Sequence, residues 1–124
     1  MSNVIYTPDA PAAIGPYSQA IVAGGLVFTS GQIPINPATG NIEVTTIEEQ
    51  TEQVCKNIQA VLEASGSSLE KVVKTVCFLS DMNDFAAFNA VYAKYFTGKP
   101  ARSCVAVKTL PKNVLVEVDT IAEV

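Results

Sequence analysis

The sequence contains no histidine and only one arginine, Arg102, against seven lysines. Without histidine there is no Ser-His or Cys-His pair, no histidine metal ligand and no imidazole that titrates near neutral pH. Charged residues are also few, at 16% of the chain, where roughly 25% is usual for a soluble domain. The chemistry of this chain is therefore restricted to carboxylates, hydroxyls, amides, lysines and one guanidinium.

A basic cluster and a long apolar run are absent as well. The net charge is −4, with 8 Lys and Arg against 12 Asp and Glu, so we expect no nucleic-acid partner. No apolar run approaches the roughly 20 residues that cross a bilayer, and residues 1–4 lack the features of a secretory signal. We therefore expect no membrane association and a cytoplasmic location.

The three cysteines, Cys55, Cys77 and Cys104, are far apart and form no Cys-x-x-Cys motif. Zinc ribbons and thioredoxin-type redox motifs are therefore unsupported. Reduced thiols in a cytosolic compartment are the simpler interpretation, with Cys55 and Cys77 as small buried hydrophobic residues.

Apolar residues make up 48% of the chain, which excludes intrinsic disorder. We expect residues 1–124 to form one domain that buries about two-thirds of the surface of the unfolded chain. The low charge content indicates that part of the remaining surface is covered by another copy of the chain.

Valine and isoleucine outnumber leucine by 25 to 6, which favours strands. We expect an edge strand over residues 3–6, an ordered proline-rich loop over 7–16, and two strands over 17–23 and 26–35. The glycine pair between these two strands is typical of a tight hairpin. A turn is expected over residues 36–40.

The first helix is expected to begin at Thr46, where Glu49 completes a capping box, and to end at Gly66. The second begins around Asp81 and ends before Pro100. Apolar residues recur at helical spacing in both: Ile47, Val54, Ile58, Val61 and Leu62 in the first, and Phe85, Phe88, Val91, Tyr92 and Tyr95 in the second.

Three further strands are expected over residues 72–79, 102–108 and 114–122, the last two joined by a turn over 110–113. The predicted order is therefore β-β-β-α-β-α-β-β. This order indicates an α+β fold with a mixed β-sheet and two helices packed on one face. The other face of the sheet, rich in valine, predicts oligomerisation.

Arg102 opens an apolar strand, either as a solvated strand end or as a bidentate clamp for a small carboxylate. If the last two strands pair across their turn, the opposite residues are Val107 with Val114, Cys104 with Glu117, and Arg102 with Asp119. This register predicts that the single arginine lies beside an acidic residue.

Glu117 stands in an otherwise apolar strand. It is an edge residue in water, an ion-pair partner of Arg102, or a group that orients or deprotonates a water molecule. Burial would raise its pKa, whereas a nearby Arg102 would lower it. Cys104 has no histidine to activate it, which argues against covalent catalysis.

Smaller polar signals occur in the N-terminal half and in the second helix. Ser30-Gly31 either exposes a hydroxyl and a backbone N–H to a ligand or forms a bulge. Tyr17 and Asn89, taken singly, are packing or capping residues. From the residues alone we expect a small carboxylate-binding site without metal or organic cofactor.

Four motifs follow one another along the chain: Ala12-Ala13-Ile14-Gly15-Pro16-Tyr17-Ser18-Gln19-Ala20, Thr29-Ser30-Gly31-Gln32-Ile33-Pro34, Asp84-Phe85 with Asn89 and Tyr92, and Pro100-Ala101-Arg102-Ser103-Cys104-Val105. With Leu110-Pro111-Lys112 and residues 117–122 they cover nearly the whole chain. In order and spacing they closely resemble the RidA/YjgF family of reactive-intermediate deaminases.

The resemblance implies a chorismate-mutase-like α+β fold and a homotrimer, packed sheet to sheet, with ligand sites in the clefts between subunits. It implies hydrolysis of 2-imino acids, such as 2-iminobutanoate and 2-iminopropanoate, to 2-oxo acids and ammonia. Pyridoxal-phosphate dehydratases form these imines, so the implied role is the control of metabolite damage. No cofactor is implied, because an imine carbon is already electrophilic.

Carried over by position, Arg102 would bind the substrate carboxylate, Glu117 would hold the attacking water, and Cys104 would contribute its backbone carbonyl. The pocket would be lined by Tyr17, Ser30, Gly31 and Asn89. A non-catalytic trimeric module that binds small oxo acids is the alternative. A third possibility is ribonuclease activity, ascribed to some family members, against which the acidic charge and missing histidine argue.

Overall fold

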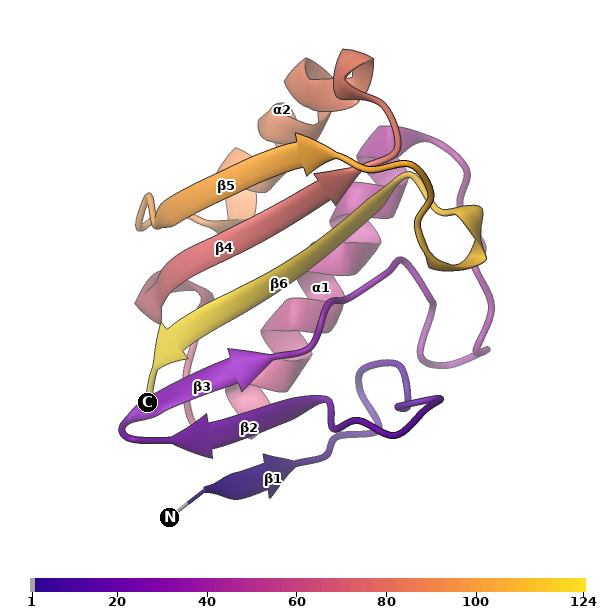
Figure 1. Cartoon of the computed structure of the whole chain (residues 1–124). Helices are drawn as coiled ribbons and strands as arrows, with labels where there is room; N and C mark the ends of the chain where they lie inside the picture. Colours follow the sequence, from indigo (N-terminus) through magenta and orange to yellow (C-terminus); the bar gives the residue numbers. More distant parts are fainter. Residues whose placement is uncertain (1) are drawn as a thin grey trace.

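Six short segments rich in valine and isoleucine pair into one mixed sheet, and two helices cover one of its faces (Figure 1). The computed structural model describes residues 2–124. In chain order the elements are β1 (Asn3–Ile5), β2 (Ala20–Ala23), β3 (Leu26–Thr29), α1 (Ile47–Ala64), β4 (Val72–Leu79), α2 (Phe85–Tyr95), β5 (Ala101–Ala106) and β6 (Val116–Glu123). The expected α+β class and the order β-β-β-α-β-α-β-β are confirmed.

The expected hairpin around Gly24-Gly25 is also confirmed. The two glycines have φ of 60° and 78°, left-handed values that a glycine adopts at little cost. The flanking strands β2 and β3 are shorter than the expected 17–23 and 26–35. After β3 ends at Thr29, the chain no longer pairs continuously with β6 and makes only an isolated bridge from Gln32 to Val118. The residues between Thr29 and Gln32 are therefore available to line a site.

The strand order is β1-β2-β3-β6-β4-β5, so β6 lies between β3 and β4 rather than beside β5. The expected pairing of the last two strands across their turn is therefore wrong. Strand β5 pairs with β4 in parallel, because α2 returns the chain to the same end of the sheet in a β-α-β crossover. The observed pairs are Arg102 with Thr75, Cys104 with Cys77, Glu117 with Phe78 and Asp119 with Val76.

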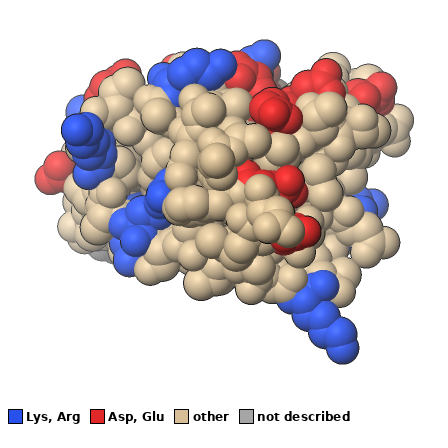
Figure 2. Space-filling view, turned by 90° about the horizontal axis from the view of Figure 1, so that it is seen from above, with Lys and Arg blue, Asp and Glu red and all other residues tan. Residues whose placement is uncertain are grey.

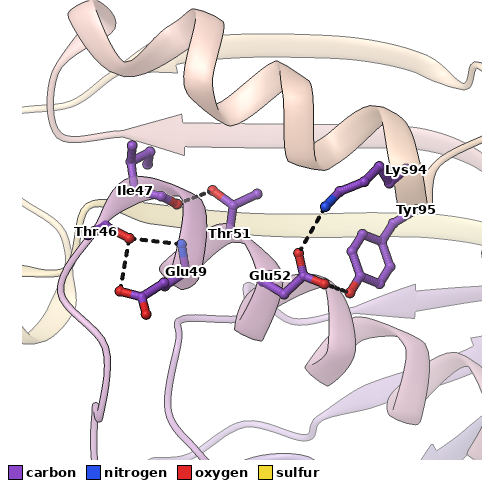
Figure 3. Close-up of polar contacts among 7 residues, drawn as sticks. All are labelled: Thr46, Ile47, Glu49, Thr51, Glu52, Lys94 and Tyr95. Carbon is purple, nitrogen blue, oxygen red and sulfur yellow. Dashed lines mark hydrogen bonds and ion pairs between the residues drawn. The ribbon is translucent and has the colours of Figure 1, made fainter.

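Helix α1 is capped at both ends by the expected residues. The Thr46 hydroxyl accepts a hydrogen bond from the Glu49 N–H at 3.1 Å and lies 3.0 Å from the Glu49 carboxylate, to which it donates (Figure 3). At the other end Gly66 has φ of 80°, and the Ser67 N–H donates to the Leu62 carbonyl at 2.9 Å. The whole predicted apolar stripe of this helix is buried.

The second helix begins later than expected. Asp81 accepts a hydrogen bond from the Asn83 N–H at 2.8 Å and caps a single 3-10 turn, Met82–Asp84, before α2 starts at Phe85. Phe88 and Tyr92 then bury their rings against the sheet, with centroids 5.4 Å apart.

Cys55 and Cys77 are fully buried in the core between the helices and the sheet, as expected. Burial raises the pKa of the Cys77 thiol to about 12, and it raises the pKa of Cys55 as well. Both thiols therefore behave as small hydrophobic groups. Neither helix in residues 2–124 has an apolar stretch of the length needed to cross a membrane.

The sheet face turned away from the helices, here called the open face, is largely apolar. Cross-strand pairing places these apolar side chains on it, beside Lys74, Glu117 and Asp119: Val4, Ile21, Phe28, Ile121, Phe78 and Val105. Val4, Phe28 and Val105 are 69%, 41% and 47% exposed. Large exposed apolar surface of this kind typically marks an interaction site.

Polar contacts join α1 to α2 on the side away from the sheet (Figure 3). The Tyr95 hydroxyl donates to the Glu52 carboxylate, and the Lys94 ammonium lies 3.6 Å from the other carboxylate oxygen. The hydrogen bond from Tyr95 lowers the pKa of Glu52 below its ordinary value of 4.5. These contacts help to hold α2 in place relative to α1.

Tyr95→Phe removes this hydrogen bond, and we expect it to lower the free energy of unfolding at neutral pH by about 1 kcal/mol. Because the folded-state pKa of Glu52 is lowered, the contribution is present above the ordinary carboxyl pKa and is lost as the pH falls through the folded-state pKa. Urea denaturation of both proteins at neutral pH and at a series of falling pH values measures it. A difference that grows as the pH falls would contradict the assignment.

Candidate functional site

Arg102 is held on the helix side of the sheet by residues of α2. Its Nη1 donates to Asn89 Oδ1 at 2.7 Å, and its guanidinium carbon lies 5.4 Å and 4.8 Å from the ring centroids of Phe85 and Tyr92. An amide and two rings orient the guanidinium without neutralising its charge. The one ion pair in residues 2–124 joins Lys94 to Glu52, so Arg102 has no carboxylate partner there.

A hollow of about 390 Å³, here called the Arg102 hollow, opens beside this guanidinium. Its residues come from α2, the link that follows it and the start of β5: Asn89, Tyr92, Ala93, Phe96, Thr97, Lys99, Pro100 and Arg102. No aspartate or glutamate lines it. The hollow is therefore suited to an anion.

Glu117 points to the opposite side of the sheet. Its neighbours Val116 and Val118 are fully buried under the helices, and successive side chains of a strand alternate between faces. A second hollow of about 390 Å³, here called the Glu117 hollow, opens on this side. Its lining residues are Ile14, Tyr17, Ser30, Gly31, Ile33, Pro111 and Glu117.

Gly31 allows the Glu117 carboxylate to take this position. A Cβ on Gly31 would overlap Glu117 Oε2 and would lie 2.9 Å from the carboxyl carbon. Any other residue at position 31 would force one of the two groups to move. The sequence left open a ligand-facing backbone or a bulge at Ser30-Gly31, and this close approach is a third reason for glycine there.

The other polar groups of the Glu117 hollow are held by the backbone. The Ser30 hydroxyl donates to the Ser18 carbonyl at 2.6 Å, so its lone pairs remain for a donor on a ligand. Tyr17 is 50% exposed, and its hydroxyl accepts from the Ile14 N–H at 3.4 Å. The hollow thus combines apolar walls with a few oriented oxygen atoms.

Gln19 was not among the site residues predicted from the sequence. It is 3% exposed, its Oε1 accepts from the Thr7 N–H at 2.7 Å, and its Nε2 donates to the carbonyls of Thr7 at 3.0 Å and Pro11 at 2.8 Å. This clamp holds the proline-rich loop that leads to Tyr17. A glutamine directly after such a loop is a usable signal, because the loop's buried backbone groups need partners.

Glu117 is partly buried, and this burial raises its pKa, with a further increase from the nearby Asp119. Of the two effects expected on the pKa of Glu117, an increase from burial and a decrease from a nearby Arg102, only the increase from burial is present. Arg102 does not contribute, because it lies two strands away on the far side of the sheet. A carboxyl with a raised pKa is a better general base than an ordinary one.

Cys104 shares the helix side of β5 with Arg102, and burial raises the pKa of its thiol, which makes it a poor nucleophile. Its carbonyl is placed differently. The Val107 N–H donates to Leu79 of β4 at 2.9 Å, and backbone groups alternate along a parallel strand. The backbone groups of Val107 face β4, and Cys104 is an odd number of residues away from Val107. The Cys104 carbonyl therefore faces the opposite side, the free edge of β5.

The structure thus sorts the expected site residues into two groups. Tyr17, Ser30, Gly31 and Glu117 meet in one hollow, whereas Asn89, Arg102 and Cys104 lie on the other side of the sheet. Residues 2–124 contain no cluster of three or more cysteines, aspartates and glutamates that could hold a metal ion.

Comparisons with known proteins agree over almost the full length of the chain. A family model described as endoribonuclease L-PSP matches residues 7–124. A putative regulator, AldR of Lactococcus lactis, is 55% identical over 123 residues, 98% of each chain. YyfA of Yersinia pestis, from the conserved Rid family, has a TM-score of 0.97 and 52% identity over 100% of both chains. E. coli TdcF, solved with bound serine, has a TM-score of 0.93 and 42% identity over 98% of each chain.

Glu117→Gln should stabilise the folded chain at neutral pH, because it removes a charge that burial and Asp119 both disfavour. Since the folded-state pKa of Glu117 is raised, the wild type loses stability as the pH rises through that pKa, and nothing is lost below the ordinary carboxyl pKa. We expect a gain of a few tenths to about 1 kcal/mol at neutral pH and none at about pH 4. Thermal denaturation at both pH values measures it, and a loss at neutral pH would contradict the assignment.

Proposed function

Because this chain belongs to the RidA/YjgF family, whose model is described as endoribonuclease L-PSP, we propose that it hydrolyses 2-imino acids. The proposed substrates are 2-iminobutanoate and 2-iminopropanoate, and the products are 2-oxo acids and ammonia. One observation carries the proposal: the Arg102 guanidinium is held by neutral groups and keeps its charge for a ligand. A 2-imino acid presents a carboxylate directly beside its reactive carbon.

In the proposed reaction Arg102 binds the substrate carboxylate through paired N–H donors, which fixes C2 in the site. Glu117 accepts a proton from a water molecule while the water oxygen bonds to C2, and the imine nitrogen takes up a proton as its double bond opens. The carbinolamine then loses ammonia, and its oxygen forms the carbonyl of the 2-oxo acid as the hydroxyl proton leaves. The free Cys104 carbonyl would help to place the water or the leaving nitrogen.

A second copy of the chain is part of the proposal. Within one chain the Arg102 hollow and the Glu117 hollow lie on opposite sides of the sheet, too far apart for one small substrate to touch both. Glu117 shares the open face with the apolar side chains. We propose a homotrimer packed through that face, in which the Glu117 hollow of one copy meets the edge strand β5 of the next, the strand that carries Arg102 and Cys104.

The bound serine in E. coli TdcF supports a ligand of this size and charge. Serine carries a carboxylate and a nitrogen on adjacent positions, as a 2-imino acid does. The imines proposed as substrates form when pyridoxal-phosphate dehydratases act on threonine or serine. The role of the chain would then be to remove these reactive intermediates.

A non-catalytic, regulatory module is the second candidate, favoured by the description of AldR as a putative regulator. Such a module would use the same Arg102 hollow to bind a small 2-oxo acid. It would show saturable binding without faster hydrolysis, which separates it from the enzyme.

Cleavage of RNA, which the family description suggests, has less support. The chain has no histidine and a net charge of −4. On the face shown in Figure 2, basic side chains are separated by neutral surface and by acidic groups rather than gathered into one patch. Binding to a phosphate backbone relies on such a patch.

The enzyme proposal is tested with a threonine dehydratase, threonine and semicarbazide, which traps the imine. We expect wild type to suppress trapping, and Arg102→Ala and Glu117→Gln each to lower hydrolysis by about 100-fold, the lower range for loss of an acid–base group. Arg102→Lys, which keeps the charge but loses the planar fork, is the matched control and should be intermediate. If wild type suppresses trapping no better than Arg102→Ala, the proposal fails.

The shared site is tested by mixing two impaired variants. Arg102→Ala and Glu117→Gln, unfolded together and refolded at equal amounts, should regain about one quarter of wild-type hydrolysis, because each site draws one group from each of two copies. Refolding each variant alone is the control. If the mixture stays as inactive as its components although mass spectrometry shows mixed oligomers, both groups act within one copy.

A further inference from the structure

The Arg102 hollow contains a second cation that the proposed reaction does not use. Lys99 lines the hollow together with Arg102, and no acidic residue lines it. Among residues 2–124 the only ion pair is that of Lys94 with Glu52, so neither Lys99 nor Arg102 has a carboxylate within pairing distance. Two unneutralised cations that line one hollow repel each other, and an anion bound between them would offset that repulsion.

The backbone around Lys99 has a defined and strained shape. Lys99 has φ of 51°, a left-handed value that is unfavourable for a residue with a side chain. The Lys99 N–H donates to the Phe96 carbonyl at 3.4 Å. The preceding Gly98 packs closely against the 3-10 turn Leu69–Lys71, which precedes β4: a Cβ on Gly98 would lie 3.1 Å from the Glu70 carbonyl oxygen. This short link turns the chain from α2 into β5 and brings Lys99 into the lining of the hollow.

The lining between the two cations is mainly apolar. Tyr92, Phe96 and Pro100 form much of it, and the volume of about 390 Å³ lies within the usual range of roughly 300–1,000 Å³ for small-molecule pockets. A three-carbon imino acid held by Arg102 would leave much of this space empty. A longer ligand with an anionic group at each end would fill more of the hollow and offer a partner to each of its two cations.

We propose that the Arg102 hollow accepts dianionic ligands as well and binds them more tightly than monoanions: 2-imino dicarboxylates and the 2-oxo dicarboxylates formed from them. The carboxylate beside C2 binds Arg102, and the distal carboxylate binds Lys99. This inference rests on the proposed function, because it keeps the same reaction at C2 and adds a second point of recognition. Lys99 acts as a specificity-determining residue and takes no part in the proton transfers.

The size of the effect follows from the exposure of Lys99. An exposed ammonium on a flexible stem contributes little to binding compared with a buried one, and salt screens it. We therefore expect a preference of about 3- to 10-fold for the dianion at low salt, and a smaller one at high salt.

Calorimetric titration with 2-oxoglutarate and 2-oxopentanoate tests the proposal, because these acids share one carbon chain and differ in the distal carboxylate. Wild type is compared with Lys99→Gln and with Lys56→Gln, which removes the same charge from an exposed position of α1 outside both hollows. Wild type and Lys56→Gln should prefer 2-oxoglutarate. Lys99→Gln should bind both acids equally and should keep the wild-type affinity for 2-oxopentanoate.

Equal binding of the two acids by wild type, or an unchanged preference in Lys99→Gln, would overturn the dianion proposal and leave imine hydrolysis standing. Binding with the expected preference but without faster imine hydrolysis would overturn only the enzyme proposal. If wild type binds neither acid, the carboxylate clamp at Arg102 is wrong, and both proposals fall with it.

Discussion

The position of β6 between β3 and β4 is the constraint on which the rest of the structure depends. It joins the N-terminal hairpin to the unit of β4, α2 and β5 in a single sheet. Val116 and Val118 of this strand are fully buried under the helices. Because side chains alternate along a strand, their burial turns Glu117 to the open face, beside the residues that follow β3. The packing of the core therefore determines where the carboxylate points.

The same sheet keeps the two charged groups of the candidate site apart. Arg102 rests against an amide and two aromatic rings, and Glu117 is partly buried with its pKa raised by burial and by Asp119. An ion pair between them would have satisfied both groups and left little for a ligand. Separation leaves the guanidinium free to bind an anion and the carboxylate free to accept a proton, which is what hydrolysis of an electrophilic imine needs. Neither step of the proposed hydrolysis requires a histidine.

Local patterns in the sequence predicted much of this structure. The capping residues of α1, the two-glycine hairpin and the buried stripe of α1 depend on contacts within a few residues, so each was predictable from spacing. The motifs identified the family and the candidate residues. One detail of the site was not predictable in this way. The close approach of Gly31 to Glu117 joins segments that are distant in the chain.

What the sequence by itself determined is the order of the elements, the family and the small set of groups available for chemistry. Only the tertiary structure decided how the strands pair, because pairing between distant segments depends on the path of the connections. The sequence favoured Arg102 beside Asp119 across a final hairpin, but the α2 crossover places β5 next to β4 instead. In this pairing Arg102 lies beside Thr75 and Glu117 lies beside Phe78. Thr75 and Phe78 are three residues apart on β4, and side chains alternate along a strand, so Arg102 and Glu117 lie on opposite faces of the sheet.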